Sequence, residues 1–103
     1  MSRVALVISP IAKKDLKGIY EFGKSKWGRE QSNKYLETVK NKMLQIFEYP
    51  NSGRDRMEIS LGIKSLSVGS HIIYYRANNN SIEVVRVLHR RQEPINYNFS
   101  SHL

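Results

Sequence analysis

The sequence predicts an α+β fold, and three observations lead to it. Apolar residues recur at helical spacing through most of the first half of the chain, whereas short runs rich in β-branched and aromatic residues fill much of the second half. One more such run precedes the helical part. The predicted order is β-α-α-β-β-β: an N-terminal strand, an antiparallel helical hairpin and a three-stranded antiparallel meander, with the helices on one face of a four-stranded sheet.

The first strand is predicted over residues 3–8, "RVALVI", and a helix is expected to follow at once. Ser9 can cap this helix because its hydroxyl can accept a hydrogen bond from an unpaired amide, and Pro10 suits the first helical position because proline has no amide hydrogen to lose there. Gly28 breaks the helical pattern. The apolar stripe of the helix consists of Ala12, Leu16, Ile19, Tyr20, Gly23 and Trp27.

A second helix is predicted from about Arg29 to the turn-forming stretch "YPNSGR" at residues 49–54. Two amphipathic helices joined by so short a link make an antiparallel hairpin. The stripe of the second helix consists of Tyr35, Leu36, Val39, Met43, Ile46 and Phe47.

Three strands are predicted in the second half, at residues 63–68, 71–76 and 82–88. Gly69-Ser70 and the run of asparagines at 78–80 separate them and favour tight hairpin turns. The first strand of the chain can join the edge of this meander. Because both helices lie on one face, we expect the other sheet face to be uncovered and open to a partner.

Length and composition suit one domain over residues 1–103, with an irregular tail from about residue 92. There is no cysteine, and the three histidines form no H-x-x-x-H pair, so we expect neither a metal site nor a cofactor. The sequence holds no apolar run of the roughly 20 residues that a membrane helix needs, and a cytoplasmic location is the default expectation. The net charge of +8 favours an acidic partner, either nucleic acid or protein.

Four blocks of the chain carry a resemblance to a known family. They are "SPIAKKDLKGIYEFGKSKWGREQSNKYL", "FEYPNSGR", "GIKSLSVGSHIIYYR" and "IEVVRVLHRR". In this order and spacing they resemble the RelE/ParE superfamily of bacterial toxins, from residue 4 to about 95, and are closest to its ParE branch. The resemblance implies a toxin of a type II toxin-antitoxin pair that is neutralised by a cognate ParD-like antitoxin. It also implies that the toxin inhibits DNA gyrase by binding, without sequence-specific recognition of nucleic acid.

The RelE branch offers an alternative function, because its toxins cut mRNA on the ribosome. Such cleavage needs a base, an acid and cations that hold the charge developing on the phosphate. His71, Arg86 and His89 are the candidates here. Active nucleases of this branch resemble one another in carrying an arginine inside the strand that reads "HIIYYR" in this chain, and residues 72–75 are "IIYY". Gyrase inhibition with no catalytic residue is therefore the preferred hypothesis.

The candidates for partner contacts are aromatic and basic, and several have a structural alternative. For Trp27 the preferred role is packing of the link between the helices against the core, and for His71 it is a hydrogen bond across its hairpin, with partner contact as the alternative for each. Arg86 lies between apolar neighbours and must either reach solvent or pair with an acid. Of Tyr74 and Tyr75, one should face the helices and the other should face outward, available for binding. The predicted partner-binding set is Trp27, Tyr75, Arg76, Arg86, His89, Arg90 and Arg91.

Overall fold

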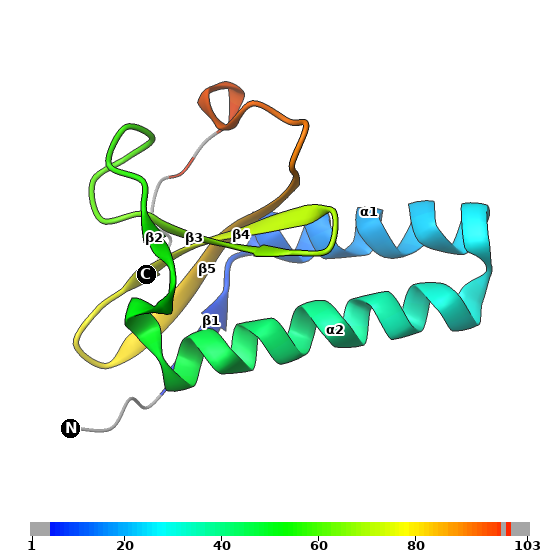
Figure 1. Ribbon diagram of the computed structural model, residues 1–103, viewed down its shortest axis with the longest axis horizontal. Coiled ribbons are helices and arrows are strands. Elements are labelled where there is room, and N and C mark those ends of the chain that lie inside the picture. The colour runs from blue at the N-terminus through cyan, green and yellow to red at the C-terminus, as the bar shows by residue number, and fades with distance from the viewer. Residues whose placement is uncertain (1–4, 98, 100–103) are drawn as a thin grey trace.

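The computed structural model describes residues 5–97 and residue 99 (Figure 1). It confirms the α+β class and the order of the predicted elements, and it adds one short strand to the sheet. The predicted first strand, residues 3–8, is observed from Ala5, and its first two residues lie outside the described part of the chain. The elements are β1 (Ala5–Ile8), α1 (Pro10–Trp27), α2 (Arg29–Glu48), a 3-10 turn (Pro50–Ser52), β2 (Arg54–Asp55), β3 (Lys64–Val68), β4 (His71–Ala77), β5 (Ser81–His89) and a second 3-10 turn (Pro94–Asn96).

The sheet has five strands in the order β1-β5-β4-β3-β2. Strands β3, β4 and β5 form the predicted antiparallel meander, and β1 joins its edge parallel to β5, from the pair Ala5 and Ser81 to the pair Ile8 and Val84. The extra strand β2 pairs with β3 at the opposite edge. Only two residues long, it is too short to leave a periodic signal in the sequence.

The start of α1 follows the predicted capping chemistry. The hydroxyl of Ser9 accepts a hydrogen bond from the amide of Ala12 at 3.0 Å and donates one to the carbonyl of Val85 at 2.9 Å. Pro10 occupies the first helical position, where proline costs nothing. Ser9 therefore caps the helix and fixes its first turn to the edge of β5.

The two helices approach closely near the link that joins them. Gly23 of α1 faces Ser32 of α2, and a Cβ at position 23 would lie 2.6 Å from the serine hydroxyl. That hydroxyl donates a hydrogen bond to the carbonyl of Tyr20 at 2.8 Å. Gly28 makes the turn with a φ of 92°, a backbone conformation that favours glycine. The far end of the hairpin, where α1 passes into α2, projects past the sheet (Figure 1).

The main core lies between the helices and one face of the sheet. Its members are the inward residues of α2 and alternate residues of the central strands, as helical and strand periodicity require. The fully buried side chains in this layer include Ala12, Val39, Met43, Ile46, Ile73, Tyr75, Ile82 and Val84.

The second face of the sheet is also covered, and the expectation of an open face is wrong. Ile63, Tyr74, Val85 and Leu88 project from it and form a second buried cluster with Phe99. The rings of Tyr74 and Phe99 meet edge to face with their centroids 5.1 Å apart. Ile59 from the 56–62 loop and Tyr97 from the C-terminal segment pack against the same cluster. Large apolar side chains on this face gain from being removed from water, and these segments provide the cover.

The C-terminal segment, predicted to be irregular from about residue 92, contains the 3-10 turn at Pro94–Asn96 and the buried ring of Phe99. Residues 98 and 100–103 of this segment lie outside the described part of the chain. Among the described residues, no helix combines the length and the apolar character that crossing a membrane requires.

Candidate functional site

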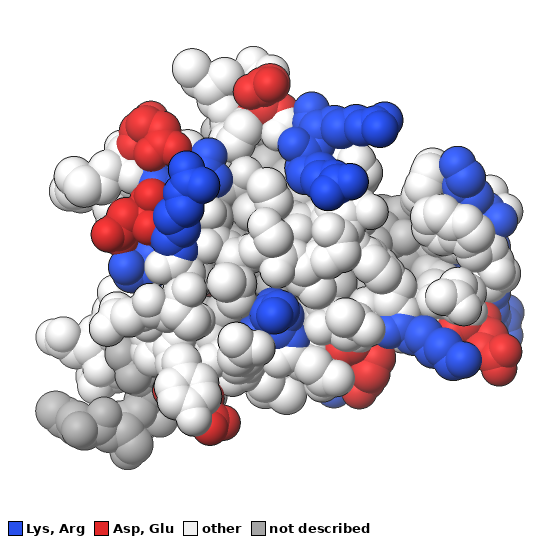
Figure 2. Space-filling model, viewed as in Figure 1, with Lys and Arg blue, Asp and Glu red and all other residues white. Residues whose placement is uncertain are grey.

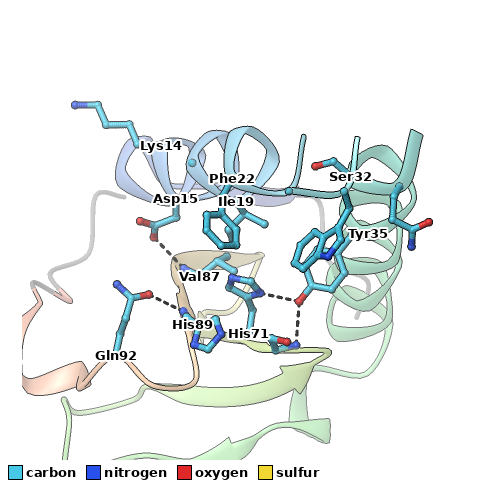
Figure 3. A pocket seen from close by; sticks show the side chains of 15 residues that line it. Lys14, Asp15, Ile19, Phe22, Ser32, Tyr35, His71, Val87, His89 and Gln92 are labelled. Atoms are coloured by element: carbon cyan, nitrogen blue, oxygen red, sulfur yellow. Dashed lines mark hydrogen bonds between the residues drawn. The ribbon is translucent and has the colours of Figure 1, made fainter. Parts of the chain in front are cut away.

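A groove of about 750 Å³ opens between the helical hairpin and the ends of β4 and β5. We call it the hairpin groove and define it by Phe22, Trp27, Tyr35, His71 and His89. Figure 2 shows a recess between the sheet and the projecting end of the hairpin, with Lys and Arg side chains on both sides of it. In Figure 3, the side chain of Phe22 points from α1 toward the sheet, and the two histidines lie on the strands opposite it.

The two histidines form the floor of the groove. They are directly paired across β4 and β5, and their rings meet edge to face with centroids 5.2 Å apart. The hydroxyl of Tyr35 is hydrogen-bonded to Nδ1 of His71, with a distance of 2.6 Å between the two atoms. It also accepts a hydrogen bond from the amide of Ser70 at 3.0 Å and lies 3.3 Å from the carbonyl oxygen of Val68. The prediction that His71 bonds across its own hairpin is therefore wrong, because the hydrogen-bond partner of its ring is Tyr35 of α2.

The two histidines have different surroundings. Burial lowers the pKa of His71, and the neighbouring charge of His89 lowers it further. Nδ1 of His89 accepts a hydrogen bond from the amide of Arg91 at 3.1 Å, so the proton of the neutral ring lies on Nε2. The amide of His89 itself donates to Oε1 of Gln92 at 2.6 Å. His89 thus ends β5 and starts the turn that carries the basic pair after it.

Arg86 pairs with an acid and is mostly buried. Its guanidinium donates two hydrogen bonds to Asp15, at 2.8 Å and 2.9 Å, and the two side chains are only 11% and 13% exposed. The same carboxylate accepts a hydrogen bond from the amide of Val87 at 3.0 Å. The pairing of β1 with β5 ends at Val84, so Asp15 takes the place of a strand partner for this amide. The ring of Tyr97 lies 5.0 Å from the guanidinium carbon. The bond to Asp15 is the main cause that raises the pKa of Arg86.

Two exposed aromatic rings form the outer wall of the groove. Phe22 is 61% exposed and Trp27 is 59% exposed, and their rings meet edge to face with centroids 5.9 Å apart. The ammonium of Lys26 lies 5.6 Å from the first ring centroid and 5.8 Å from the second. The role preferred for Trp27 from the sequence, packing of the helix link against the core, is wrong because its ring is exposed and belongs to neither core cluster.

The remaining predicted contact residues lie in different environments. Arg90 and Arg91 are exposed in the turn after His89. Arg76 lies on the second face of the sheet, where it donates to the carbonyl of Phe99 at 2.6 Å and to the hydroxyl of Ser60 at 2.9 Å. It therefore fastens the C-terminal segment to the sheet.

The prediction that Tyr75 faces outward and is available to a partner is wrong. Its side chain is fully buried on the helix side, where its hydroxyl accepts from the amide of Gly53 at 2.9 Å and donates to the carbonyl of Pro50 at 2.7 Å. Tyr74, which does point to the other face, is buried as well, under Phe99 and the 56–62 loop. Both tyrosines are core residues because both faces of the sheet are covered.

The family model described as "ParE toxin of type II toxin-antitoxin system, parDE" matches residues 6–94. The chain belongs to the ParE toxin family. This match confirms the resemblance inferred from the four sequence blocks, including the assignment to the ParE branch.

Curated relatives agree with this ParE assignment, and a solved structure shares the fold. Toxin ParE1 of Mycobacterium tuberculosis is 35% identical over 88 residues, which cover 84% of this chain and 90% of the relative. Toxin ParE1 of Caulobacter vibrioides is 31% identical over 83 residues, which cover 81% of this chain and 85% of the relative. A structure titled "Chromosomal ParDE TA system from P. aeruginosa" has the same fold, with a TM-score of 0.74 at 19% identity, covering 84% of this chain and 95% of that chain.

The motifs of the ParE resemblance have mainly structural roles in this toxin. The glycine of the "W-G" link makes the helix turn, and Gly53 of the "P-x-x-G-R" turn allows the Tyr75 hydroxyl to approach the backbone. Gly69 of the "V-G-S-H" hairpin has a φ of 56°, and a Cβ there would lie 2.7 Å from the ring of Tyr35. Arg86 of the last block is held by Asp15. These residues maintain the fold and thereby shape the hairpin groove.

Three residues of the groove were not singled out in the sequence. One feature of the sequence pointed indirectly to Asp15, because an arginine between apolar neighbours, such as Arg86, needs an acid from elsewhere in the chain. Phe22 is an aromatic residue outside the apolar stripe of α1, which marks a ring left on the surface. Tyr35 lies within the stripe of α2 and gave no sign that its hydroxyl would bond to a histidine. In residues 5–97 and 99, no three His, Asp or Glu side chains gather as metal ligands.

Proposed function

We propose that this ParE toxin inhibits DNA gyrase by binding to it, without turnover of its own and without a cofactor. The family assignment supports the proposal, because the ParE resemblance implies gyrase as the target. A toxin that binds gyrase acts where the chromosome lies, so the proposal also places the chain in the cytoplasm.

The ion pair of Arg86 and Asp15 is the observation that favours gyrase binding over RNA cleavage. Cleavage needs a cation that faces the charge developing on the phosphate, whereas the guanidinium of Arg86 gives two hydrogen bonds to a carboxylate and its side chain is only 11% exposed, which leaves it little access to a phosphate. The inner positions of β4, where nuclease relatives resemble one another in having an arginine, are occupied by residues 72–75. These four apolar and aromatic residues pack into the two cores.

The exposed residues around the groove suit a protein contact. Trp27 and Phe22 are large rings held in solvent, and aromatic and arginine residues dominate the energetics of protein interfaces. Arg90 and Arg91 are exposed nearby in the turn after β5, where they can steer an acidic surface toward the toxin. We assign the gyrase contact to these four residues.

The proposal is tested with purified toxin in a gyrase supercoiling assay. We expect inhibition by the unmodified toxin, a large loss of inhibition in Trp27→Ala and in the double variant Arg90→Ala with Arg91→Ala, and full inhibition by Tyr49→Ala. Tyr49 is a matched control because it is equally exposed but lies at the other end of α2. Unchanged supercoiling together with specific mRNA cuts in a translating extract would reverse the assignment.

RNA cleavage is the second candidate, and the contact between His71 and His89 favours it. Two imidazoles 5.2 Å apart in an open groove could divide the roles of base and acid. If His71→Ala and His89→Ala each abolish mRNA cutting and toxicity while the protein stays folded and still binds its antitoxin, this candidate is correct. If both variants keep their toxicity, the histidines only support the groove.

We also infer that a ParD-like antitoxin neutralises the toxin. The net charge of +8 attracts an acidic antitoxin segment, and the edge of β1 and the hairpin groove offer it places for strand addition or for an amphipathic helix. Co-expression with the product of a small neighbouring reading frame should yield a co-purifying complex and restore growth. Growth arrest that no neighbouring gene relieves would count against this inference.

A further inference from the structure

The hairpin groove combines exposed aromatic faces with positive charge, and this combination suits nucleic acid. We propose that the groove binds an unpaired nucleotide of a single nucleic-acid strand, independently of its sequence. The base would stack against the rings of Trp27 and Phe22, and the phosphates would lie along the basic rim. Stacking on aromatic rings within a basic groove is the general way in which proteins hold single strands without reading their sequence.

The two rings provide the stacking surface. Because Phe22 and Trp27 meet edge to face at an interplanar angle of 83°, their faces are not stacked on each other. Both rings remain more than half exposed, at 61% and 59%. A duplex keeps the faces of its bases within the stack, so only an unpaired base can use such a surface. The groove volume of about 750 Å³ lies within the usual range for a bound small ligand.

The rim provides charge of the right sign for a phosphate backbone. Lys26 lies beside both rings, and Arg90 and Arg91 form the turn between two residues that line the groove, His89 and Gln92. Cations in this arrangement are the usual partners of phosphate groups.

The acids near the groove do not cancel this charge. Asp15 lines it, but its carboxylate is held by Arg86 and by a backbone amide. Glu21 and Glu30 do not line the groove, whereas Lys14 does. The groove therefore favours an anion.

Strand binding goes beyond the proposed function and is measured without gyrase. In a complex with gyrase, the bound strand would be DNA that the enzyme has opened. Only this role of the groove within the complex rests on the proposed function. If the oligonucleotide experiments below succeed while supercoiling is unaffected, the groove assignment stands and the gyrase proposal fails. The reverse result would leave gyrase inhibition in place and remove the nucleotide site.

The first experiment uses Trp27 as its own probe, because it is the only tryptophan in the chain. Titration with unlabelled oligothymidylate of about 12 nucleotides, within the range of site sizes of single-strand binding domains, should quench its fluorescence in a saturable way. Raising the salt concentration should weaken the binding. An oligouridylate of equal length shows whether RNA is held as well as DNA. Absence of saturable quenching by both strands overturns the proposal.

The second experiment measures fluorescence anisotropy of a labelled oligothymidylate with variants of the full chain. Phe22→Ala and Trp27→Ala should each weaken binding about tenfold or more, in line with the loss of one stacked base, whereas Tyr49→Ala should not change it. Lys26→Gln should weaken binding and reduce its salt dependence, and Lys40→Gln, an exposed lysine of α2, is the matched control.

Two results of the anisotropy experiment would contradict the proposal. Equal losses in the groove variants and in their controls would mean that only the overall charge attracts the strand. Binding of polyglutamate with the same affinity and the same dependence on Trp27 would mean that the groove accepts an acidic peptide instead.

Discussion

The hydroxyl of Tyr35 on α2 lies 2.6 Å from Nδ1 of His71 at the start of β4. The same hydroxyl accepts the amide of Ser70 in the turn between β3 and β4. One side chain therefore fastens the helical hairpin to the hairpin of the sheet, at the floor of the groove.

Removing the hydroxyl in Tyr35→Phe should lower the free energy of unfolding by about 1 kcal/mol, because the histidine and the turn amide lose a partner while the ring keeps its packing. Urea unfolding followed by circular dichroism measures this. Tyr49→Phe is the control, since its side chain is exposed, and it should leave the stability unchanged. Equal stability of the two variants would show that the bond contributes nothing.

Stability should depend on the protonation of His71. Burial and the nearby His89 lower its pKa from the ordinary value near 6.5, so the unfolded chain binds the proton more readily than the folded chain does. This contribution to stability is complete above about pH 6.5, and it is lost as the pH falls from there through the folded-state pKa. Urea unfolding between about pH 7.5 and pH 5 should show a smaller decrease in His71→Gln than in the unmodified chain. Identical decreases would refute this account of His71.

The ion pair of Asp15 and Arg86 should be worth far more than a surface pair. Asp15→Ala leaves a nearly buried guanidinium and the amide of Val87 without a partner, and we expect a loss of about 3 kcal/mol in the free energy of unfolding. Asp55→Ala breaks an ion pair with Lys64 in which nitrogen and oxygen are 2.7 Å apart. Because Asp55 is 74% exposed, the loss in the free energy of unfolding should stay within about 1 kcal/mol. Chemical denaturation of both variants makes the comparison, and similar losses would contradict it.

Two glycines should respond in opposite directions to an added methyl group. A Cβ at Gly53 would lie 2.8 Å and 2.9 Å from two ring carbons of Tyr75, so Gly53→Ala should destabilise the fold by about 1 to 3 kcal/mol. A Cβ at Gly18, in the middle of α1, meets nothing within 4 Å, and Gly18→Ala should stabilise by about 0.5 to 1 kcal/mol. Thermal melting of both variants gives the signs, and a stabilised Gly53→Ala would show that the turn can move away from Tyr75.

Most of the fold could be predicted because its signals are local. The capping pair of Ser9 and Pro10 marked the start of α1, and the change from helical to strand periodicity located the meander. The cover on the second sheet face could not be predicted in this way, because Phe99 meets Tyr74 only after the chain has folded back. The prediction for Tyr75 failed for a different reason: its side chain takes the face that the helices cover, and alternation along the strand did not decide which of the two tyrosines would face the helices.

The candidate site was only partly predictable, because its contacts join distant parts of the chain. The sequence raised the question of whether Arg86 pairs with an acid, but the acid lies 71 residues away in α1. The pairing of His71 with His89 depends on the register of β4 against β5, which periodicity does not determine. Phe22 and Tyr35 complete the groove through the length and placement of the helical hairpin, which are properties of the folded chain.

The most direct test of the central claim is a titration of gyrase with the purified toxin, repeated at several gyrase concentrations above the dissociation constant. Inhibition by binding without turnover predicts that the toxin concentration for half-inhibition rises in proportion to the gyrase concentration, with near-stoichiometric amounts of toxin required. Full loss of supercoiling at toxin amounts far below those of gyrase, increasing with incubation time, would mean that the toxin acts catalytically and would contradict the account.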